Sequence, residues 1–496
     1  MSNAAVVETT PQRARTNDKR TNDKRMCWPL AGFGLAWCIF FCINTILPKP
    51  EGLSPQGMTA IAVMGWTITI WLTNALPKSI SGLGIPLMLI AFGVFKKTPD
   101  AFSGFTENES FLVLGAFLLA AVMSVTSLDK KIALGIVSRV KPRVTHLLGG
   151  FFAAHIVTAL LVPATLARAG MFLPIVAGVN KLLGDDEEYR PARKALAMAA
   201  IGFGAVFAGP IFLTGHMPNV IMASLLNAKA GAGITWSGWT WLHWPLLGLF
   251  PVMYLWIVHC FKLRGVGIPC GLDRMCRERD ELGPVTGDQV AILGLVGLAV
   301  ALWATENVLH RLPSGIVLVG VVALMFVPGL TRLTWRDVQS RTNWGTWLLL
   351  AGALSLVKAF SNTGADEWLA GRMVDIVPAW GWLGTLLFVM VLVQVLRLGI
   401  ISNVGAVTLM APIVYSLAGF LHFNSVSFTL AVLNVDTYAL ILPMEVTASL
   451  IAYSSGEFTF IEFMKTGSML TLLAMLYIAF VMVPWWGYNG FPLWAS

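Results

Sequence analysis

The chain consists of long apolar segments joined by short polar ones. Nine apolar segments are each long enough to cross a hydrocarbon core of about 30 Å as one helix. Four others differ, because two have a polar tip between two apolar arms and two are interrupted near the middle. We take the two segments with polar tips as re-entrant hairpins and the two interrupted segments as membrane crossings. The pattern then predicts an all-α polytopic membrane protein of about 11 transmembrane helices and two re-entrant hairpins. The nine segments are 27–47, 56–76, 79–95, 109–128, 239–261, 288–305, 314–330, 344–362 and 464–486.

The hairpins and interrupted helices are where the pattern predicts a binding site. Non-helical backbone at membrane depth is tolerated only where protein buries it or where it lines a wet cavity. Helix N-termini and free N–H groups at such points attract an anion, and free carbonyl groups attract a cation. The hairpins are predicted at 144–179 and 379–418, with tips at 163–168 and 399–405, and the interrupted helices at 195–227 and 426–452, with breaks at 209–219 and 443–448.

The two halves of the chain resemble each other. The segment that begins at Phe111 is similar to the one that begins at Trp347, and each is followed by a hairpin and an interrupted helix. Within the hairpins, Pro174 aligns with Pro412. Five predicted crossings separate the copies, so they enter the membrane from opposite sides as an inverted-topology repeat. Paired discontinuous helices are typical of secondary transporters, whereas a channel has no need of them.

Composition and charge narrow the class of protein further. Of 496 residues, 56% are hydrophobic and 12% charged, against roughly 25% charged in soluble domains, which excludes a soluble enzyme. The net charge of +8 follows membrane topology and not nucleic-acid binding. With a cytoplasmic N-terminus, 25 of the 34 Lys and Arg residues fall in cytoplasmic segments and 6 outside. The positive-inside rule therefore predicts an internal N-terminus and an external C-terminus in a cell membrane, the inner membrane in a bacterium.

The second hairpin tip reads Ser402-Asn403-Val404, and the first reads Ala164-Thr165-Leu166 followed by Ala167-Arg168. At these tips the chain resembles the divalent anion/sodium symporter family, over about residues 56 to 486. Bacterial members of that family carry dicarboxylates, citrate, tartrate or sulfate. Both of their tips carry Ser-Asn-Thr, and Ala-Arg often follows the first. Pro218 and Asn219 match the first broken-helix loop, and Thr447 stands where the second loop belongs.

The resemblance implies a homodimer in which a scaffold holds a transport domain that moves across the membrane as an elevator. It also implies sodium at the tips and a substrate carboxylate held by Asn and Thr side chains. The implied division is a disordered cytoplasmic tail (1–26), scaffold (27–140), transport domain (141–262), cytoplasmic loop (263–287), second scaffold part (288–377), second transport part (378–486) and external C-terminus (487–496).

The candidate site residues come from the tips and breaks. The expected cation ligands are Ser402, Asn403 and Glu445, with sodium placed at Ser402 and Asn403. Because the first tip lacks the Ser and Asn, we expect fewer coupled sodium ions than in relatives with both motifs. The expected substrate ligands are Thr165, Arg168, Pro218, Asn219, Asn403, Val404 and Thr447.

Ionisable residues inside apolar segments are costly and therefore functional candidates. Arg168 is predicted to bind the anion, and Arg397 before the second tip is a second candidate. Glu445 in the second break is expected to hold a cation or a proton. His216, at the corresponding place in the first break, is either a stand-in for a missing cation or a neutral hydrogen-bonded histidine.

The sequence predicts a secondary active transporter of small multivalent organic anions, di- or tricarboxylates, coupled to a cation. Apart from a sodium ion, no cofactor is expected. A sodium-independent exchanger and a sulfate or sulfonate transporter stay open as alternatives. A membrane-embedded hydrolase or acyltransferase, from a different class, is disfavoured because the sequence holds no HExxH, CxxC or Walker motif.

Overall fold

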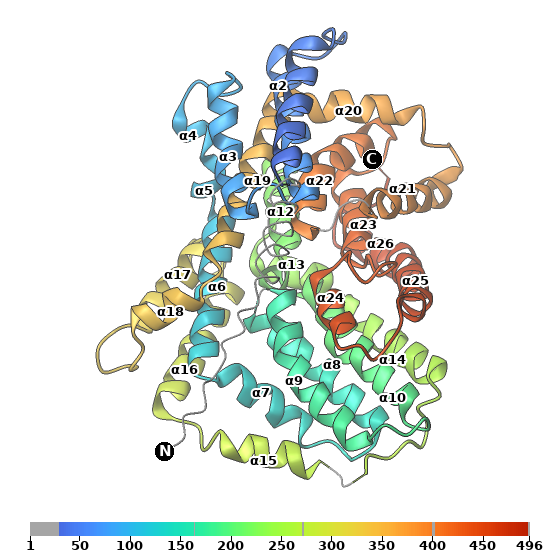
Figure 1. Ribbon diagram of the computed structural model, residues 1–496. Coiled ribbons are helices and arrows are strands. Elements are labelled where there is room, and N and C mark those ends of the chain that lie inside the picture. Colours follow the sequence, from blue (N-terminus) through green and yellow to red (C-terminus); the bar gives the residue numbers. More distant parts are fainter. Residues whose placement is uncertain (1–28, 163, 270–271, 399–401, 495–496) are drawn as a thin grey trace, which may run out of the picture.

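The computed structural model describes residues 29–494 apart from 163, 270–271 and 399–401, and every named element in that part of the chain is a helix (Figure 1). Ten helices are long and apolar enough to cross a membrane, and three shorter apolar helices accompany them. The prediction of an all-α polytopic membrane protein is confirmed. The predicted tail, 1–26, lies outside the described residues.

The first half of the chain contains the first hairpin and the first broken helix. Its elements are η1 (Cys42–Ile46), α2 (Pro55–Thr73), α3 (Lys78–Ala91), α4 (Thr98–Ala101), α5 (Ser103–Thr106), α6 (Asn108–Val125), α7 (Leu128–Val137), α8 (Val144–Leu161), α9 (Thr165–Leu183), α10 (Arg190–Ala195), η2 (Leu196–Phe203), α11 (Gly204–Ala208), η3 (Gly209–Ile211), η4 (Leu213–Gly215) and α12 (Met217–Ala230).

The second half contains the second hairpin and the second broken helix. Its elements are α13 (Trp236–His243), η5 (Trp244–Gly248), α14 (Leu249–Cys260), α15 (Asp273–Glu281), α16 (Gly287–Ala304), α17 (Ser314–Leu324), α18 (Trp335–Arg341), α19 (Trp344–Thr363), α20 (Ala365–Val374), α21 (Gly381–Arg397), α22 (Asn403–Phe420), α23 (Ser425–Thr437), α24 (Thr447–Ser454), α25 (Phe460–Tyr477), η6 (Ile478–Met482) and α26 (Val483–Tyr488).

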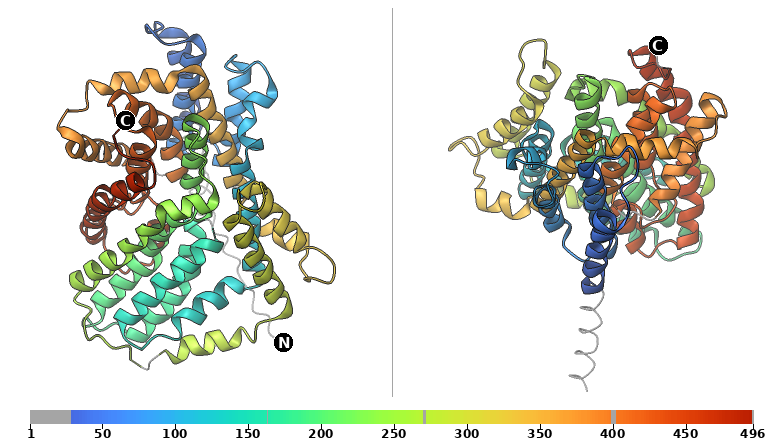
Figure 2. Two further views of the ribbon diagram at one scale, coloured as in Figure 1. Left: turned by 180° about the vertical axis from the view of Figure 1, so that it is seen from behind. Right: turned by 90° about the horizontal axis from the view of Figure 1, so that it is seen from above.

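The two halves share helix boundaries at the positions that the sequence aligns. The second arms of the hairpins begin at Thr165 and Asn403, and each follows a residue in extended conformation. The turns that end α6 and α19 each contain a residue in the left-handed region, Ser127 (φ 56°) and Gly364 (φ 69°). In Figure 1 and in the left view of Figure 2, the first hairpin, α8 and α9, lies in the lower part of the molecule, and α21 and α22 lie in the upper part.

Two predicted crossings are shorter than the sequence pattern indicated. The apolar segment 79–95 gives a helix that ends at Ala91, because Gly93 turns the chain with φ 76°. The segment 314–330 gives a helix that ends at Leu324. There the Thr331 hydroxyl donates to the Met325 carbonyl and closes the turn. Apolar composition continues past both helix ends, so the pattern did not show them.

Close packing of α3 against α19 fixes one wall of the functional site. A Cβ atom on Gly352 would overlap the carbonyl of Gly82, and one on Gly82 would lie 2.5 Å from the Leu348 carbonyl oxygen. Glycine at both positions therefore lets the two backbones touch. Ser79 lies beside Gly345 near the starts of the same helices. The pair runs in parallel, which brings Lys78 next to the N-terminus of α19.

A side chain from another helix binds free backbone groups of the second break. The second break runs from the end of α23 to Thr447, starting earlier than the predicted 443. Thr471 of α25 donates to the Tyr438 carbonyl at 2.8 Å and accepts the Leu440 N–H at 3.3 Å. Because these partners are remote in sequence, the local pattern did not show where α23 ends.

Candidate functional site

Both hairpin tips and both breaks border one cavity of about 210 Å³. The lining also includes the starts of α3 and α19, which the sequence prediction left out. The residues that line this cavity, called the tip cavity below, are Lys78, Ala164, Thr165, Leu166, Met217, Asn343, Thr346, Leu349, Ser402, Asn403, Val404 and Thr447.

Five helices begin at the tip cavity. Their first residues, all of which line it, are Lys78 (α3), Thr165 (α9), Met217 (α12), Asn403 (α22) and Thr447 (α24). The N-cap residue of a sixth helix, Asn343 of α19, lines it as well. Each N-terminus carries a partial positive charge and N–H groups without intrahelical partners. Their convergence makes the tip cavity favourable for a negatively charged ligand.

Lys78 carries the formal charge of the tip cavity. Among the described residues that line it, no other side chain is charged. Lys78 is half-buried, and its ammonium can move into the cavity on a flexible stem. Hydroxyl and amide groups of Thr165, Ser402 and Thr447 and of Asn343 add polar contacts. The sequence pattern did not distinguish Lys78 from an ordinary cytoplasmic loop lysine.

The structure brings five of the predicted site residues together at the tip cavity. These are Thr165, Ser402, Asn403, Val404 and Thr447. The other four lie behind the lining and are buried. These are Arg168, Pro218, Asn219 and Glu445.

Arg168 points away from the tip cavity and binds backbone. Its guanidinium donates to the carbonyl groups of Val162 at 2.5 Å, Gly215 at 2.8 Å and Ala205 at 2.8 Å. The side chain is fully buried. These three carbonyls belong to the first tip, the first break and α11, so Arg168 ties those segments together. In this arrangement Arg168 lies behind the residues that line the tip cavity and stabilises the backbone there. The sequence prediction had instead made it a direct ligand of the anion.

Asn219 and Glu445 each hold one break. The Asn219 amide donates to the carbonyls of Gly209 at 3.0 Å and Phe212 at 2.8 Å. The Glu445 carboxylate accepts the N–H groups of Ile441 at 2.9 Å and Leu442 at 3.0 Å. Both residues therefore satisfy backbone groups that the interrupted helices leave free.

A hydrogen-bonded chain connects the second tip with the first break. Arg397, fully buried, donates to the Asn403 side-chain oxygen and, at 2.8 Å, to the Glu445 carbonyl. Because a guanidinium can only donate, the Asn403 amide nitrogen faces His216 Nε2, at 3.1 Å. His216 Nε2 then accepts, so this contact describes a neutral imidazole. Of the two sequence hypotheses for His216, the contact favours the hydrogen-bonded one.

The Arg397 contact bears on the expected sodium site. A sodium ion bound to Ser402 and Asn403 needs the Asn403 side-chain oxygen, and in this structure that oxygen accepts from Arg397. The Ser402 hydroxyl accepts the Gly405 N–H at 3.3 Å. Among the described residues no group of three or more His, Cys, Asp or Glu side chains could hold a metal ion. Ser402 and Asn403 can therefore bind sodium only if the Arg397 guanidinium moves away from the Asn403 side-chain oxygen.

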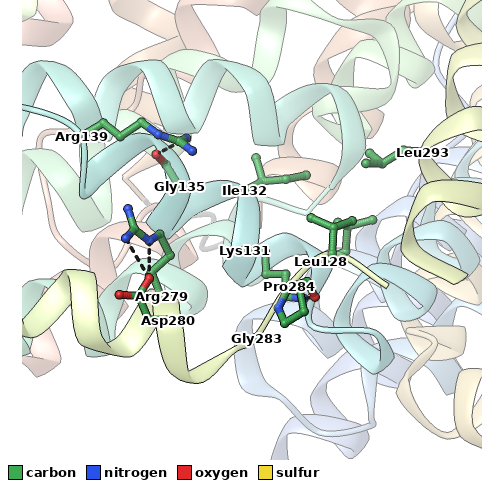
Figure 3. Close-up of a pocket in the computed structure, with 11 residues that line it drawn as sticks. Leu128, Lys131, Ile132, Gly135, Arg139, Arg279, Asp280, Gly283, Pro284 and Leu293 are labelled. Carbon is green, nitrogen blue, oxygen red and sulfur yellow. Dashed lines mark hydrogen bonds and ion pairs between the residues drawn. The ribbon is translucent and has the colours of Figure 1, made fainter. Parts of the chain in front are cut away.

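A second cavity, of about 520 Å³, lies between α7, α15 and the start of α16 (Figure 3). Its basic side chains are already engaged. Lys131 donates to the Pro284 carbonyl and to Gln289, and Arg279 is paired with Asp280 at 2.8 Å. None of the predicted site residues lines it. The tip cavity is therefore the candidate substrate site.

Comparison with known proteins shows the family to which the chain belongs. The family described as the sodium:sulfate symporter transmembrane region matches residues 33–490. The chain belongs to this family. The resemblance read from the tips and breaks is thereby confirmed, and the protein is a multi-pass membrane transporter of the family.

Relatives match along nearly the whole chain. A membrane protein of Cupriavidus necator is 26% identical over 489 residues, covering 93% of this chain and 94% of its own. The sodium-dependent dicarboxylate transporter SdcS of Staphylococcus saprophyticus is 24% identical over 465 residues and covers 89% of each chain. The crystal structure of the Alcanivorax borkumensis YdaH transporter matches with a TM-score of 0.55 at 16% identity, over 85% of this chain and 100% of that one. That structural match shows a shared fold.

Proposed function

We propose that this protein carries small organic dianions across a cell membrane by secondary active transport, with the tip cavity as the substrate site. The observation that carries the proposal is the meeting of five helix N-termini with one lysine in one cavity. One carboxylate of the substrate pairs with Lys78, and the other is held by the N-termini of α9 and α22. The dicarboxylate named for the SdcS relative has this chemistry.

The size of the cavity favours a small anion, and its lining favours a dicarboxylate over citrate. At about 210 Å³ the tip cavity is smaller than the roughly 300–1,000 Å³ of pockets for drug-sized ligands. Val404 and Leu166 replace the hydroxyl side chains of the family tips and make one side apolar. A short carbon chain between two carboxylates fits such a lining.

Purified protein in liposomes tests the proposal by counterflow. Vesicles loaded with unlabelled succinate are diluted into labelled succinate, without an ion gradient, and uptake is followed over time. We expect transient accumulation that unlabelled malate and fumarate suppress more strongly than citrate, sulfate or a sulfonate. Sulfate as the strongest competitor would select the sulfate alternative. Absence of counterflow with every dicarboxylate would refute the proposal.

We further propose that the protein works as a homodimer with an elevator motion of the transport domain against the scaffold. In this division Lys78, Asn343 and Thr346 belong to the scaffold, and the tips and breaks belong to the moving part. The substrate then sits between the two parts. Mass measurement of the protein in mild detergent tests the dimer, and a monomer that transports would contradict it.

Coupling is part of the same proposal. Sodium dependence is expected from relatives, with at most one ion at Ser402 and Asn403, because Ala164 and Leu166 at the first tip offer no oxygen side chains. Initial uptake is measured against sodium concentration at a clamped membrane potential. A Hill coefficient clearly above one would show a second sodium ion. Sodium-independent uptake accelerated by internal anion would select the exchanger.

A further inference from the structure

Asp436 is a carboxylate that the proposed function leaves without a role. It lies near the end of α23 and is fully buried. Among the described residues, neither of its carboxylate oxygens has a hydrogen-bond donor, and its Oδ1 lies 3.4 Å from Arg397 Nε. A buried carboxylate without donors is costly, which makes it a candidate for a functional group.

Arg397 is shared between two carboxyl groups. Besides the contact with Asp436, it donates to the main-chain carbonyl of Glu445. The Glu445 carboxylate keeps two N–H donors, from Ile441 and Leu442, which stabilise its charged form. With Asp436 also ionised, one guanidinium would face two negative charges, leaving this buried cluster with a net charge of about −1.

In the described part of the chain, no other charged group on the neighbouring elements forms an ion pair with Asp436. Of the helices packed against α23, α21 contributes Arg397. Lys229 of α12 is paired with Asp366, and Glu462 of α25 is paired with Lys194. Lys465 of α25 is exposed, and His243 of α13 contacts Asn434 at 3.2 Å. Arg168 donates to three main-chain carbonyls and pairs with no carboxylate in the described part of the chain.

We propose that Asp436 binds a proton that is transported together with the anion. The cluster is adjacent to the substrate site, because Arg397 also holds the side-chain oxygen of Asn403, which lines the tip cavity. An ionised Asp436 draws on the positive charge of Arg397 and repels an anion nearby. A protonated Asp436 leaves that charge free to act on an anion bound beside Asn403. Proton and anion therefore bind cooperatively, and each increases the affinity for the other.

Asp436 suits a proton better than a metal ion. A sodium ion needs several oxygen ligands to replace its water, whereas a proton needs a single carboxylate oxygen. Within the part of the chain that the structure describes, Arg397 alone lies within ion-pair distance of Asp436. The inference rests on the proposed anion transport and adds a coupling ion to the same site.

The experiment uses the full chain in liposomes with the membrane potential clamped. Uptake of labelled succinate is driven by an acidic exterior, with and without sodium, and a dye inside the vesicles reports pH. For one proton per cycle, each unit of pH difference should raise steady-state accumulation about tenfold. The lumen should acidify together with succinate uptake.

Two variants make the test specific. Asp436→Asn should exchange succinate in counterflow at a rate that no longer depends on pH, and it should lose accumulation driven by the pH gradient. Thr437→Val is the matched control, because Thr437 is the next residue, is fully buried and has a hydroxyl without a hydrogen-bond partner. This control should keep the response of the unmodified protein.

The outcomes separate the two proposals. If Asp436→Asn still accumulates succinate about tenfold per pH unit, Asp436 is not the proton site. If the unmodified protein exchanges succinate but ignores the pH gradient, proton coupling is refuted while anion transport stands. If the unmodified protein exchanges no dicarboxylate, the proposed function itself fails. Should Asp436→Asn not fold, Asp436→Glu keeps the carboxyl group and should shift the pH midpoint of uptake.

Discussion

Lys78 lines the tip cavity and is the first residue of α3, and we expect this position to give it two effects on a bound anion. Its ammonium supplies a full charge, and the N-terminus of α3 adds the partial charge of the helix dipole. The carbonyl of Lys78 accepts the Ser81 hydroxyl at 2.8 Å, and Ser81 in turn accepts from the Trp71 indole at 2.8 Å. This short chain fixes the backbone from which the lysine extends.

Replacing Lys78 by Ala should weaken substrate binding. A hydrogen bond to a charged group contributes about 1.5–3 kcal/mol, so KM for succinate should rise roughly 10- to 100-fold with a smaller change in maximal rate. Lys78→Arg keeps the charge, so its KM should lie between those of the unmodified protein and Lys78→Ala. Lys96→Ala, at an exposed lysine, is the matched control. An unchanged KM for Lys78→Ala would remove this residue from the site.

Arg168 tests whether a buried arginine supports the backbone or binds substrate. Arg168→Gln removes donors from three carbonyls, and each unsatisfied group costs about 1–3 kcal/mol. We expect Arg168→Gln to have a clearly lower thermal unfolding midpoint in detergent than the unmodified protein. The midpoint of Arg168→Lys should lie between the two. A variant with unchanged thermal stability and lost succinate affinity would instead return Arg168 to the role of anion ligand.

The sequence predicted residues whose role follows from a local motif. Thr165, Ser402, Asn403 and Thr447 occupy the tips and breaks that the pattern revealed, and all of them line the cavity. Asp436 was missed, although a carboxylate inside an apolar segment was an available signal. The sequence pattern could not predict the direction in which the Arg168 side chain points. A residue one turn past a tip can either line the cavity or bind main-chain carbonyls behind it.

At the scale of elements, the helix starts matter more than the helix lengths. The apolar segments showed where the chain crosses the membrane. The close packing of α3 against α19, however, depends on two glycines in separate halves of the chain. Their pairing is a tertiary contact, and a single sequence does not reveal it. The same contact brings the N-termini of both helices to the tip cavity, so this side of the cavity, in the predicted scaffold, depends on packing and not on a motif.

A methyl group between α3 and α19 should therefore damage the site from a distance. Gly352→Ala places a Cβ against the Gly82 carbonyl, so the helices must separate and Lys78 must shift. Overpacking of this kind costs about 1–3 kcal/mol, and we expect a lower unfolding midpoint together with a higher KM. Gly320→Ala on α17 is the control, because no atom lies within 4 Å of its Cβ. Equal behaviour of the two variants would show that the contact is not tight.

At the scale of the whole molecule, the predicted scaffold and transport parts meet in a partly buried ion pair. Lys229, at the end of α12, pairs with Asp366 on α20, and Asp366 also accepts the Ser416 hydroxyl of α22 at 3.1 Å. The pair lies beside a cavity of about 610 Å³ lined by Lys229, Tyr415 and Ser416 among others. An elevator motion must break this contact in every cycle, because its partners belong to different parts.

A reversible cross-link at this pair tests whether the parts move. Lys229 and Asp366 are both replaced by Cys in a chain whose six native cysteines are changed to Ser, and the two thiols are joined with a short cleavable bis-thiol reagent. We expect succinate counterflow to stop on cross-linking and to return when the linker is cleaved, because one conformation is held. Each single-Cys variant with the same reagent controls for modification alone. Full counterflow in the cross-linked double variant would show that α12 and α20 keep their distance throughout the cycle, and the moving boundary would then lie elsewhere in the molecule.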